Sequence, residues 1–391
     1  MENSILKTYN RYQLSFLRGK GSWLLGNDNS WYLDFGSGIA VNILGHSHPS
    51  LIKALNKQSK LLWHTSNLFK IDNQEKLADF LVEKTFADKV FFTNSGAESI
   101  ECAIKIARKY GNTYKKKKNK IISFSGAFHG RTYGALSISG SKKISEGFEP
   151  ILDGVENIPF NKLDKLEENI TDEVCAVIIE PIQGEGGINE VSLAFIKKLQ
   201  IICKNKNVLL IFDEIQSGIG RTGKFLAHEF YDAKPDIVTI AKGIGGGFPI
   251  GCCLLTNKVA KVMEVGSHGS TFGGNPLGCS VSIAILNEIF KEGFLTSISR
   301  KALNFKIRLE ELVREYPKVF DEVRGKGFML GLKCKISNKL FVDEALFNKL
   351  ILIPGGDNTI RILPPINITK KDLTIGLKII ENVASKLEKK Q

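Results

Sequence analysis

The chain has 391 residues, of which 43% are hydrophobic and 24% charged, and its formal net charge is +13. A chain of this length and composition can bury a large core and needs no disulfide or metal to stabilise its fold. It shows no signal peptide and no apolar run of the ~20 residues that a membrane helix needs. Its seven scattered cysteines include no CxxC pair, a pattern typical of reduced thiols. We therefore expect a cytoplasmic protein.

The positive charge would also suit a protein that binds nucleic acid. However, the basic residues are mostly lysines spread along the chain, and the single tight run, at 115–118, falls in a polar connection that we expect to be a solvated loop. No aromatic stretch of the kind that stacks RNA bases accompanies it. The charge is therefore expected to attract anionic small molecules, with neither nucleic acid nor membrane as a partner.

In chain order, the N-terminal segment 1–45 contains a hairpin-like stretch at 22–34 and is expected to pack with a small C-terminal domain. A large domain is expected at 46–280, because short apolar runs alternate there with helical stretches. Ile100, Ala103, Ile104 and Ala107, for example, recur at the spacing of one helix face. The expected strands are short runs of mostly β-branched or aromatic residues. They lie at 89–92, 121–124, 174–179, 208–212 and 237–241.

Continuous apolar runs are typical of strands buried on both faces, and their alternation with helices predicts the α/β class, with a mostly parallel sheet between two helical layers. In such sheets the ligand lies beyond the carboxyl ends of the strands. After about residue 280 the pattern changes to a helical stretch at 281–290, a lysine-rich amphipathic segment, and short strands near 327–334 and 359–363. This pattern predicts a smaller α+β domain at 281–391.

Lys242 ends an apolar strand and is followed by Gly243 and by three further glycines at 245–247. A lone lysine at a strand end is usually a side chain that reaches solvent. The alternative is a Schiff-base lysine, whose amine must be neutral to attack a carbonyl and is driven toward that state by burial. Glycines after it would let the backbone approach a ligand closely.

Asp213 stands at the carboxyl end of another apolar strand, and Gln216 follows it. The strand resembles a Walker B strand, and the segment 218–224 fits GxxxxGK, so a P-loop NTPase is a rival interpretation. Phe225 occupies the position of the Mg²⁺-binding hydroxyl, however, and one strand cannot supply both Walker elements. We therefore favour a carboxylate that pairs with a protonated pyridine nitrogen.

Ser95, Gly96 and Ala97 lie where a strand turns into a helix, a position that favours anions because its N–H groups and the helix dipole point outward. The same residues also fit an ordinary cap, in which Ser95 begins the helix and Glu98 completes a capping box. The two interpretations are compatible, because a capped helix can still bind phosphate.

Three further clusters follow strands or precede helices, and each by itself would be an ordinary loop. The first contains Phe128, which can stack on a flat ring, and Arg131, which can bind a carboxylate. The second places Glu185 between glycines that would let it move, and the third contains Ser270 and Thr271. The six histidines include one HxH pair and no Cys/His cluster, so no metal site is expected.

Taken together and in this order, these segments resemble the class III (ornithine-type) aminotransferases, over about residues 21–380. The runs that carry the resemblance are FHGRT, EPIQGEGG, FDEIQSGIGRTG, AKGIGGGFPIG, HGSTFGGNP and IRILPP. The resemblance implies fold type I, in which a large domain with a mostly parallel seven-stranded sheet is joined to a smaller α+β domain. It also implies a homodimer with sites at the interface and pyridoxal 5'-phosphate as the cofactor.

By position, the resemblance assigns four residues to the cofactor ring. Lys242 would be the Schiff-base lysine, Asp213 the partner of the ring nitrogen, Gln216 the neighbour of the ring hydroxyl, and Phe128 the stacking aromatic. The phosphate would be held by four more residues, the last of them from the other subunit: Ser95, Gly96, Ala97 and Thr271.

The resemblance also implies transfer of the δ-amino group of N2-acetyl-L-ornithine to 2-oxoglutarate, a step of arginine biosynthesis that gives N-acetyl-L-glutamate 5-semialdehyde and L-glutamate. Arg131 and Ser270 would contact the donor, and Arg361 would bind the α-carboxylate of glutamate and 2-oxoglutarate, with Glu185 as its switchable partner. The stretch 36–42 lacks a tyrosine with which ornithine aminotransferases bind a free α-amino group, which favours an acylated donor. Ornithine, succinylornithine, succinyldiaminopimelate and 4-aminobutyrate remain alternative donors, whereas Glu185 and Arg361 suit glutamate-1-semialdehyde mutase less well.

Overall fold

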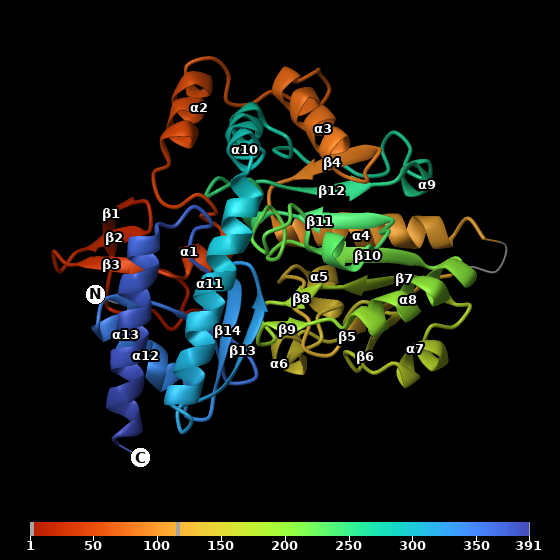
Figure 1. Ribbon diagram of the computed structural model, residues 1–391. Helices are drawn as coiled ribbons and strands as arrows, with labels where there is room; N and C mark the ends of the chain where they lie inside the picture. Colours follow the sequence, from red (N-terminus) through yellow and green to blue (C-terminus); the bar gives the residue numbers. More distant parts are fainter. Residues whose placement is uncertain (1–3, 115–117, 391) are drawn as a thin grey trace.

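A seven-stranded sheet dominates the computed structural model, which describes residues 4–114 and 118–390 (Figure 1). Its strands lie in the order β4-β12-β11-β10-β7-β5-β6, and only β12 runs antiparallel to its neighbours. The predicted α/β class with a mostly parallel sheet is therefore confirmed. The strand bounds are β4 (Lys89–Thr93), β12 (Gly251–Leu255), β11 (Ile237–Ile240), β10 (Leu209–Asp213), β7 (Val174–Ile179), β5 (Lys120–Phe124) and β6 (Val155–Ile158).

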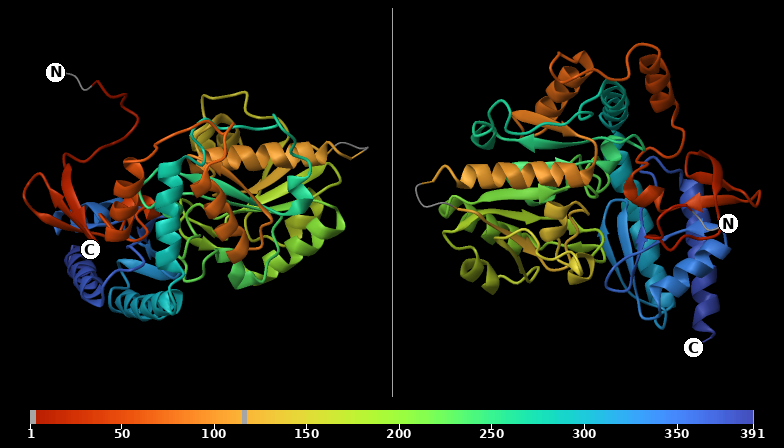
Figure 2. Two further views of the ribbon diagram at one scale, coloured as in Figure 1. Left: turned by 90° about the horizontal axis from the view of Figure 1, so that it is seen from above. Right: turned by 180° about the vertical axis from the view of Figure 1, so that it is seen from behind.

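The central strands are buried on both faces, which explains their continuous apolar sequences. In β10, Leu209 and Ile211 contribute to the core beneath helix α4 (Gly96–Gly111). Leu210 and Phe212 contribute to the larger core on the opposite face, with residues of helix α8 (Leu193–Asn205). The two helical layers can be followed in Figure 2.

The N-terminal strands lie beside the C-terminal part of the chain, as Figure 1 shows for the red and blue segments. Strands β1 (Phe16–Lys20), β2 (Trp23–Gly26) and β3 (Trp31–Asp34) form an antiparallel meander, and β3 pairs in parallel with β15 (Leu350–Ile351). The indole Nε1 of Trp23 donates to Asp372 of helix α13 (Lys370–Glu388) at 3.0 Å.

The C-terminal part contains a second, antiparallel sheet in the order β13-β14-β17-β16. Its strands are β13 (Phe320–Lys326), β14 (Met329–Cys334), β17 (Thr359–Ile362) and β16 (Ile353–Pro354). Helices α11 (Phe294–Glu315) and α12 (Asn338–Phe347) contact this sheet, and α13 packs against both helices. The division of the chain at residues 45 and 280 stays a prediction.

Among the remaining elements, α1 is a turn whose four residues all have positive φ. The others are short or lie at the edges of these layers. In chain order, the remaining elements are α1 (Ser37–Ala40), α2 (Pro49–Ser59), α3 (Asp72–Lys84), α5 (Tyr133–Ser137), α6 (Lys142–Ser145), α7 (Asp164–Asn169), β8 (Ile182–Gln183), β9 (Asn189–Glu190), the 3₁₀ helices η1 (Ala227–Tyr231) and η2 (Lys242–Ile244), α9 (Asn257–Ala260) and α10 (Pro276–Ile289).

The lysine run at 115–118 falls mainly on residues that lie outside the described part of the chain. Its last member, Lys118, is buried, and its ammonium group donates to the carbonyl of Lys206 at 2.5 Å. The expectation of a solvated loop is therefore wrong for Lys118. Among the described residues, no helix is both long and apolar enough to span a membrane.

Candidate active site

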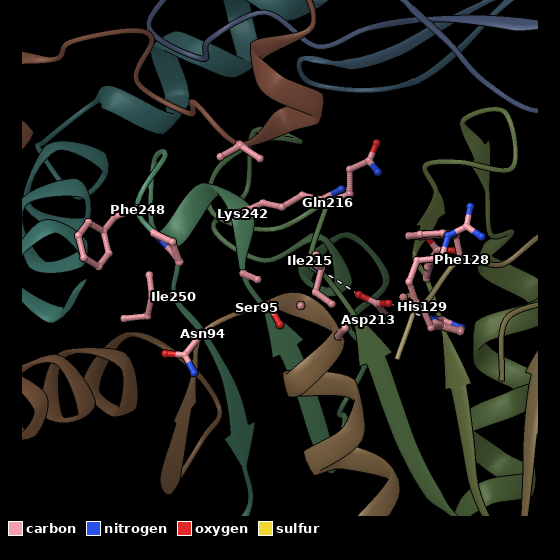
Figure 3. Close-up of a pocket in the computed structure, with 18 of the residues that line it drawn as sticks. Asn94, Ser95, Phe128, His129, Asp213, Ile215, Gln216, Lys242, Phe248 and Ile250 are labelled. Carbon is pink, nitrogen blue, oxygen red and sulfur yellow. Dashed lines mark hydrogen bonds and ion pairs between the residues drawn. The ribbon is translucent and has the colours of Figure 1, made fainter. Parts of the chain in front are cut away.

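The carboxyl ends of the parallel strands meet at one edge of the large sheet, where they surround a cavity of about 420 Å³ (Figure 3). Asp213 ends β10, Glu180 follows β7, and Lys242 follows β11 by two residues. Phe128 comes from the loop after β5, and all four side chains line the cavity. Strand direction alone therefore collects residues that are more than 100 positions apart in the sequence.

Lys242 is partly buried and begins the short 3₁₀ helix η2 with a φ of +45°, a left-handed conformation that is uncommon for a residue with a side chain. Figure 3 shows its side chain extended along the cavity toward Gln216. Burial lowers the pKa of Lys242, and the nearby charges of Glu185 and Arg361 act in opposite directions. The site therefore favours the neutral amine, which is the nucleophilic form.

Asp213 is buried and has partners for both carboxylate oxygens. Its Oδ2 lies 2.7 Å from Nδ1 of His129, and its Oδ1 accepts from the backbone N–H of Ile215 at 3.0 Å. His129 is also buried, and its Nε2 has no hydrogen-bond partner among the described residues. Sequence reasoning did not single out His129, although it stands in the FHGRT run beside Phe128.

Helix α4 begins at the cavity, with Ser95 as its N-cap. The hydroxyl of Ser95 accepts from the backbone N–H of Glu98 at 3.2 Å, which confirms Ser95 as the N-cap. The carboxylate of Glu98 accepts from the backbone N–H of Asn94 and not from that of Ser95, so the predicted capping box is not formed. The first N–H groups of a helix have no partner within it, and in α4 they belong to Gly96 and Ala97, which line the cavity. A Cβ atom on Gly96 would lie 2.9 Å from Cδ1 of Ile215, so any larger residue there would displace the Ile215 side chain.

Phe128 and Arg131 lie together on the side of the cavity near His129. Figure 3 shows Phe128 beside His129. The guanidinium of Arg131 is 5.7 Å from the ring centre of Phe128. Arg131 is exposed to solvent while it lines the cavity, so it is accessible to an anionic group that enters from outside.

Arg361, on β17 of the second sheet, reaches Gln216 at the rim of the cavity. Its Nη1 donates to Oε1 of Glu185 at 2.5 Å and to Oε1 of Gln216 at 3.4 Å, and its Nη2 donates to the carbonyl of Pro354 at 3.1 Å. Arg361 is buried, whereas Glu185 is about one-third exposed. An arginine that could bind a carboxylate is therefore occupied by an acid of this chain.

The glycines around Glu185 allow close packing. The carbonyl of Glu185 accepts from the backbone N–H of Gly356 at 2.8 Å, and the carbonyl of Gly186 accepts from Asn189 at 2.8 Å. A Cβ atom on Gly184 would lie 2.4 Å from the amide carbon of Gln216. The backbone at Glu185 is therefore held in place, and the movement expected of this residue is limited to its side chain.

Ser270 and Thr271 stand apart from the other predicted site residues. They lie in the loop between α9 and α10, and the described residues that line the cavity do not include them. Ser270 connects to the site through its hydroxyl, which accepts from the amide of Asn94 at 3.2 Å. Thr271 is exposed. The cavity lining does include eight of the predicted residues: Ser95, Gly96, Ala97, Phe128, Arg131, Asp213, Gln216 and Lys242.

The predicted cofactor can be tested against these features. Four features surround one cavity. The amine suits an aldehyde, and the buried carboxylate with its fixed partners suits a pyridine nitrogen. The helix N-terminus suits a phosphate, and the aromatic ring suits a flat ring. Gly96 leaves room at the helix N-terminus, because a Cβ atom there would press on the side chain of Ile215, which also lines the cavity. The residues present therefore fit pyridoxal 5'-phosphate.

Comparisons with known proteins agree with this interpretation. The sequence model of the family described as aminotransferase class-III matches residues 6–384. The acetylornithine aminotransferase of Rhodobacter capsulatus is 46% identical over 386 residues, which cover 98% of each chain. The crystal structure of N-acetylornithine aminotransferase from Stenotrophomonas maltophilia superposes with a TM-score of 0.86 at 34% identity and covers 98% of both chains.

A structure of ornithine aminotransferase from Toxoplasma gondii superposes with a TM-score of 0.94 at 31% identity, over 98% of this chain and 93% of that chain. That enzyme is described with pyridoxal phosphate at partial occupancy in its active site.

Proposed function

This chain belongs to the class III aminotransferases, which depend on pyridoxal phosphate, and from that premise we propose that it transfers the δ-amino group of N2-acetyl-L-ornithine to 2-oxoglutarate. The products are N-acetyl-L-glutamate 5-semialdehyde and L-glutamate, and the reaction is a step of arginine biosynthesis. The observation that carries the proposal is the Glu185–Arg361 pair beside Lys242, because it provides a carboxylate site that can be closed for one substrate and opened for the other.

Pyridoxal phosphate, when bound, supplies a carbonyl that condenses with amines and a protonated ring that accepts the electrons of a broken C–H bond. Lys242 would hold the carbonyl through Nζ, and its amine, once released by the incoming donor, would take the proton from the δ-carbon of the donor. Asp213, oriented by His129 and Ile215, would keep a proton on the ring nitrogen. Phe128 would stack on the ring.

The phosphate would bind at the N-terminus of α4, where Ser95, Gly96 and Ala97 lie. Gln216 would lie beside the ring hydroxyl. Thr271 would contribute to the phosphate site of a second copy of the chain, a role supported by its exposure and its distance from the cavity of its own chain.

The two substrates present different ends to the ring. The donor brings its δ-amine, so its α-carboxylate stays distant, where the exposed Arg131 and Ser270 would bind it. 2-Oxoglutarate brings its α-keto carbon, so its α-carboxylate must lie close to the ring, where Arg361 would bind it once Glu185 turns away. Glu185 would therefore prevent the donor from binding by its carboxylate in the wrong orientation.

An acylated donor is favoured by the turn at α1, which precedes the cavity wall at Val41. Ile39 in this turn is an aliphatic residue and cannot donate or accept a hydrogen bond for a free α-amino group. The relatives named for acetylornithine support the same donor. A cytoplasmic location is supported by the seven cysteines, all of which are free thiols.

The test is a comparison of kcat/KM for four donors, each with 2-oxoglutarate: N2-acetylornithine, succinylornithine, ornithine and 4-aminobutyrate. We expect N2-acetylornithine to exceed ornithine by tenfold or more, on the order of 1.4 kcal/mol in transition-state binding. A higher kcat/KM for ornithine or 4-aminobutyrate would replace the proposed donor, and a succinylornithine value above that of acetylornithine would change the acyl group.

A further inference from the structure

Glu180 is a buried acid of the cavity. It belongs neither to the Asp213–His129 pair nor to the Glu185–Arg361 pair, and the proposed reaction gives it no role. It follows strand β7 as the first acid of the EPIQGEGG run, is 5% exposed, and lines the cavity together with Asp213. An acid buried beside another acid is unfavourable unless its oxygens have hydrogen-bond partners. Its partners therefore indicate what it does.

Both oxygens of Glu180 accept backbone hydrogen bonds, and the donors belong to two different loops. Oε2 accepts from the N–H of Phe128 at 3.1 Å, in the loop after β5. Oε1 accepts from the N–H of Gly184 at 3.3 Å, directly before Glu185. The carboxyl group of Glu180 thus connects the loop that carries Phe128 to the loop that carries Glu185, the partner of Arg361.

We propose that Glu180 is a positioning residue, which fixes Phe128 against the cofactor ring and Glu185 against Arg361 through its two carboxylate oxygens. The inference rests on the proposed function for the roles of Phe128 and Glu185, and it adds a residue that couples them. Gly184 directly precedes Glu185, so Glu180 holds the backbone on one side of Glu185, while Gly356 holds the carbonyl of Glu185 itself.

A carboxyl group is required at this position, since both of its oxygens can accept a hydrogen bond in a fixed geometry, even when one of them carries a proton. A glutamine would turn one acceptor into an NH₂ group, which would face a backbone N–H of Phe128 or Gly184 without a possible hydrogen bond. An aspartate keeps both acceptors but is one methylene shorter and cannot reach both loops at once. Burial and the neighbouring Asp213 carboxylate also raise the pKa of Glu180.

The experiment compares Glu180→Gln and Glu180→Asp with a matched control, Glu214→Gln. Glu214 is also fully buried and also accepts two backbone hydrogen bonds, from Ala227 and His228, but it does not line the cavity. Two constants are measured besides the unfolding temperature. One is the dissociation constant of pyridoxal phosphate, and the other is that of glutarate, an unreactive dicarboxylate, titrated calorimetrically into the cofactor-loaded enzyme.

We expect both Glu180 variants to weaken the binding of pyridoxal phosphate and of glutarate, each by roughly fivefold or more, the size expected for an unsatisfied buried N–H group. Glu214→Gln should lower the unfolding temperature with both constants within about twofold of wild type. If Glu180→Gln does not fold, Glu180→Asp decides the question.

The proposal is overturned if the Glu180 variants lose only stability, as the control does, because Glu180 would then be a structural residue. It is also overturned if only one of the two constants changes, because the two loops would then not be coupled. Neither titration uses an amino donor, so a wild-type enzyme that rejects N2-acetylornithine would count against the proposed function alone.

Discussion

Lys242 is a charged residue type in a place where charge is costly, and this conflict determines its chemistry. Desolvation of its amine lowers its pKa, and its backbone adopts a left-handed φ. Strained backbone and a perturbed pKa at one residue of a cavity are typical of functional sites. Such a residue is expected to reduce the stability of the protein in exchange for reactivity.

We expect Lys242→Ala to abolish multiple turnover, with a loss on the order of 10⁴-fold or more, because one amine is both nucleophile and proton carrier. Circular dichroism should remain unchanged, and the unfolding temperature of the cofactor-free protein should rise, because the desolvated amine is gone. Steady-state kinetics and thermal unfolding of the same preparation check both points. A variant that keeps a wild-type kcat would remove Lys242 from the mechanism.

Glu180 is expected to make stability depend on pH. Burial and then Asp213 raise its pKa well above the ordinary 4.5, so the folded state holds the proton more tightly than the unfolded state. This contribution is complete below about pH 4.5 and is lost as the pH rises through the raised pKa. Glu180→Gln cannot titrate. As the pH rises above about 4.5, the wild type should therefore lose unfolding free energy relative to the variant, and an equal pH dependence of the two proteins would contradict this.

At the scale of elements, the candidate switch is formed by the loop of the small two-stranded sheet β8-β9 and a strand of the antiparallel sheet β13-β14-β17-β16. Glu185 lies in the loop that joins β8 and β9, and Arg361 lies on β17. The backbone of Glu185 is fixed by Gly356, so only its side chain is expected to move. A short side-chain movement needs no domain rearrangement, which suits a residue that must change state twice in every catalytic cycle.

Arg361→Ala should slow the half-reaction with 2-oxoglutarate far more than the half-reaction with N2-acetylornithine. The charge-assisted contact with a carboxylate is worth about 2–4 kcal/mol when water is excluded, roughly thirtyfold to a thousandfold. Glu185→Gln should do the reverse, by easing glutamate binding and increasing reaction at the α-amine of donors in which it is free. Single-turnover absorbance changes follow each half separately, and equal slowing of both by Arg361→Ala would refute the switch.

The elements that can be predicted best from the sequence are those with a recognisable pattern of neighbouring residues. Strands β7 and β10 are continuous apolar runs, and Asp213 and Lys242 were predicted at the ends of such runs. Strand β12 begins with Gly251 and two cysteines and carries no β-branched residue, so its pattern did not indicate a strand. The contacts of Asp213 with His129 depend on the spatial order of β10, β7 and β5, which no local pattern specifies.

At the scale of the whole molecule, an exposed apolar patch lies beside the loop that carries Thr271. The amide of Asn67 donates to the carbonyls of Ser270 at 2.9 Å and Gly273 at 3.2 Å, so the segment around it and this loop form one surface. Its large exposed side chains are Leu61, Leu62, Trp63, Leu68, Phe69 and Phe272. Monomers rarely expose so many neighbouring apolar groups. We infer that a second copy of the chain covers the patch and thereby receives Thr271 at its phosphate site.

Phe69→Glu should therefore convert a dimer into a monomer, because a buried carboxylate at an interface is costly without a partner. Phe347→Glu is the matched control, since Phe347 is 78% exposed against 68% for Phe69 and lies on helix α12, outside the patch. Light scattering after size exclusion should give twice the chain mass for the wild type and the control, and the mass of one chain for Phe69→Glu. The monomer should also bind pyridoxal phosphate more weakly, since it lacks Thr271 of a second copy. A monomeric wild type, or two variants with the same mass, would show that the patch is not an interface between copies of this chain.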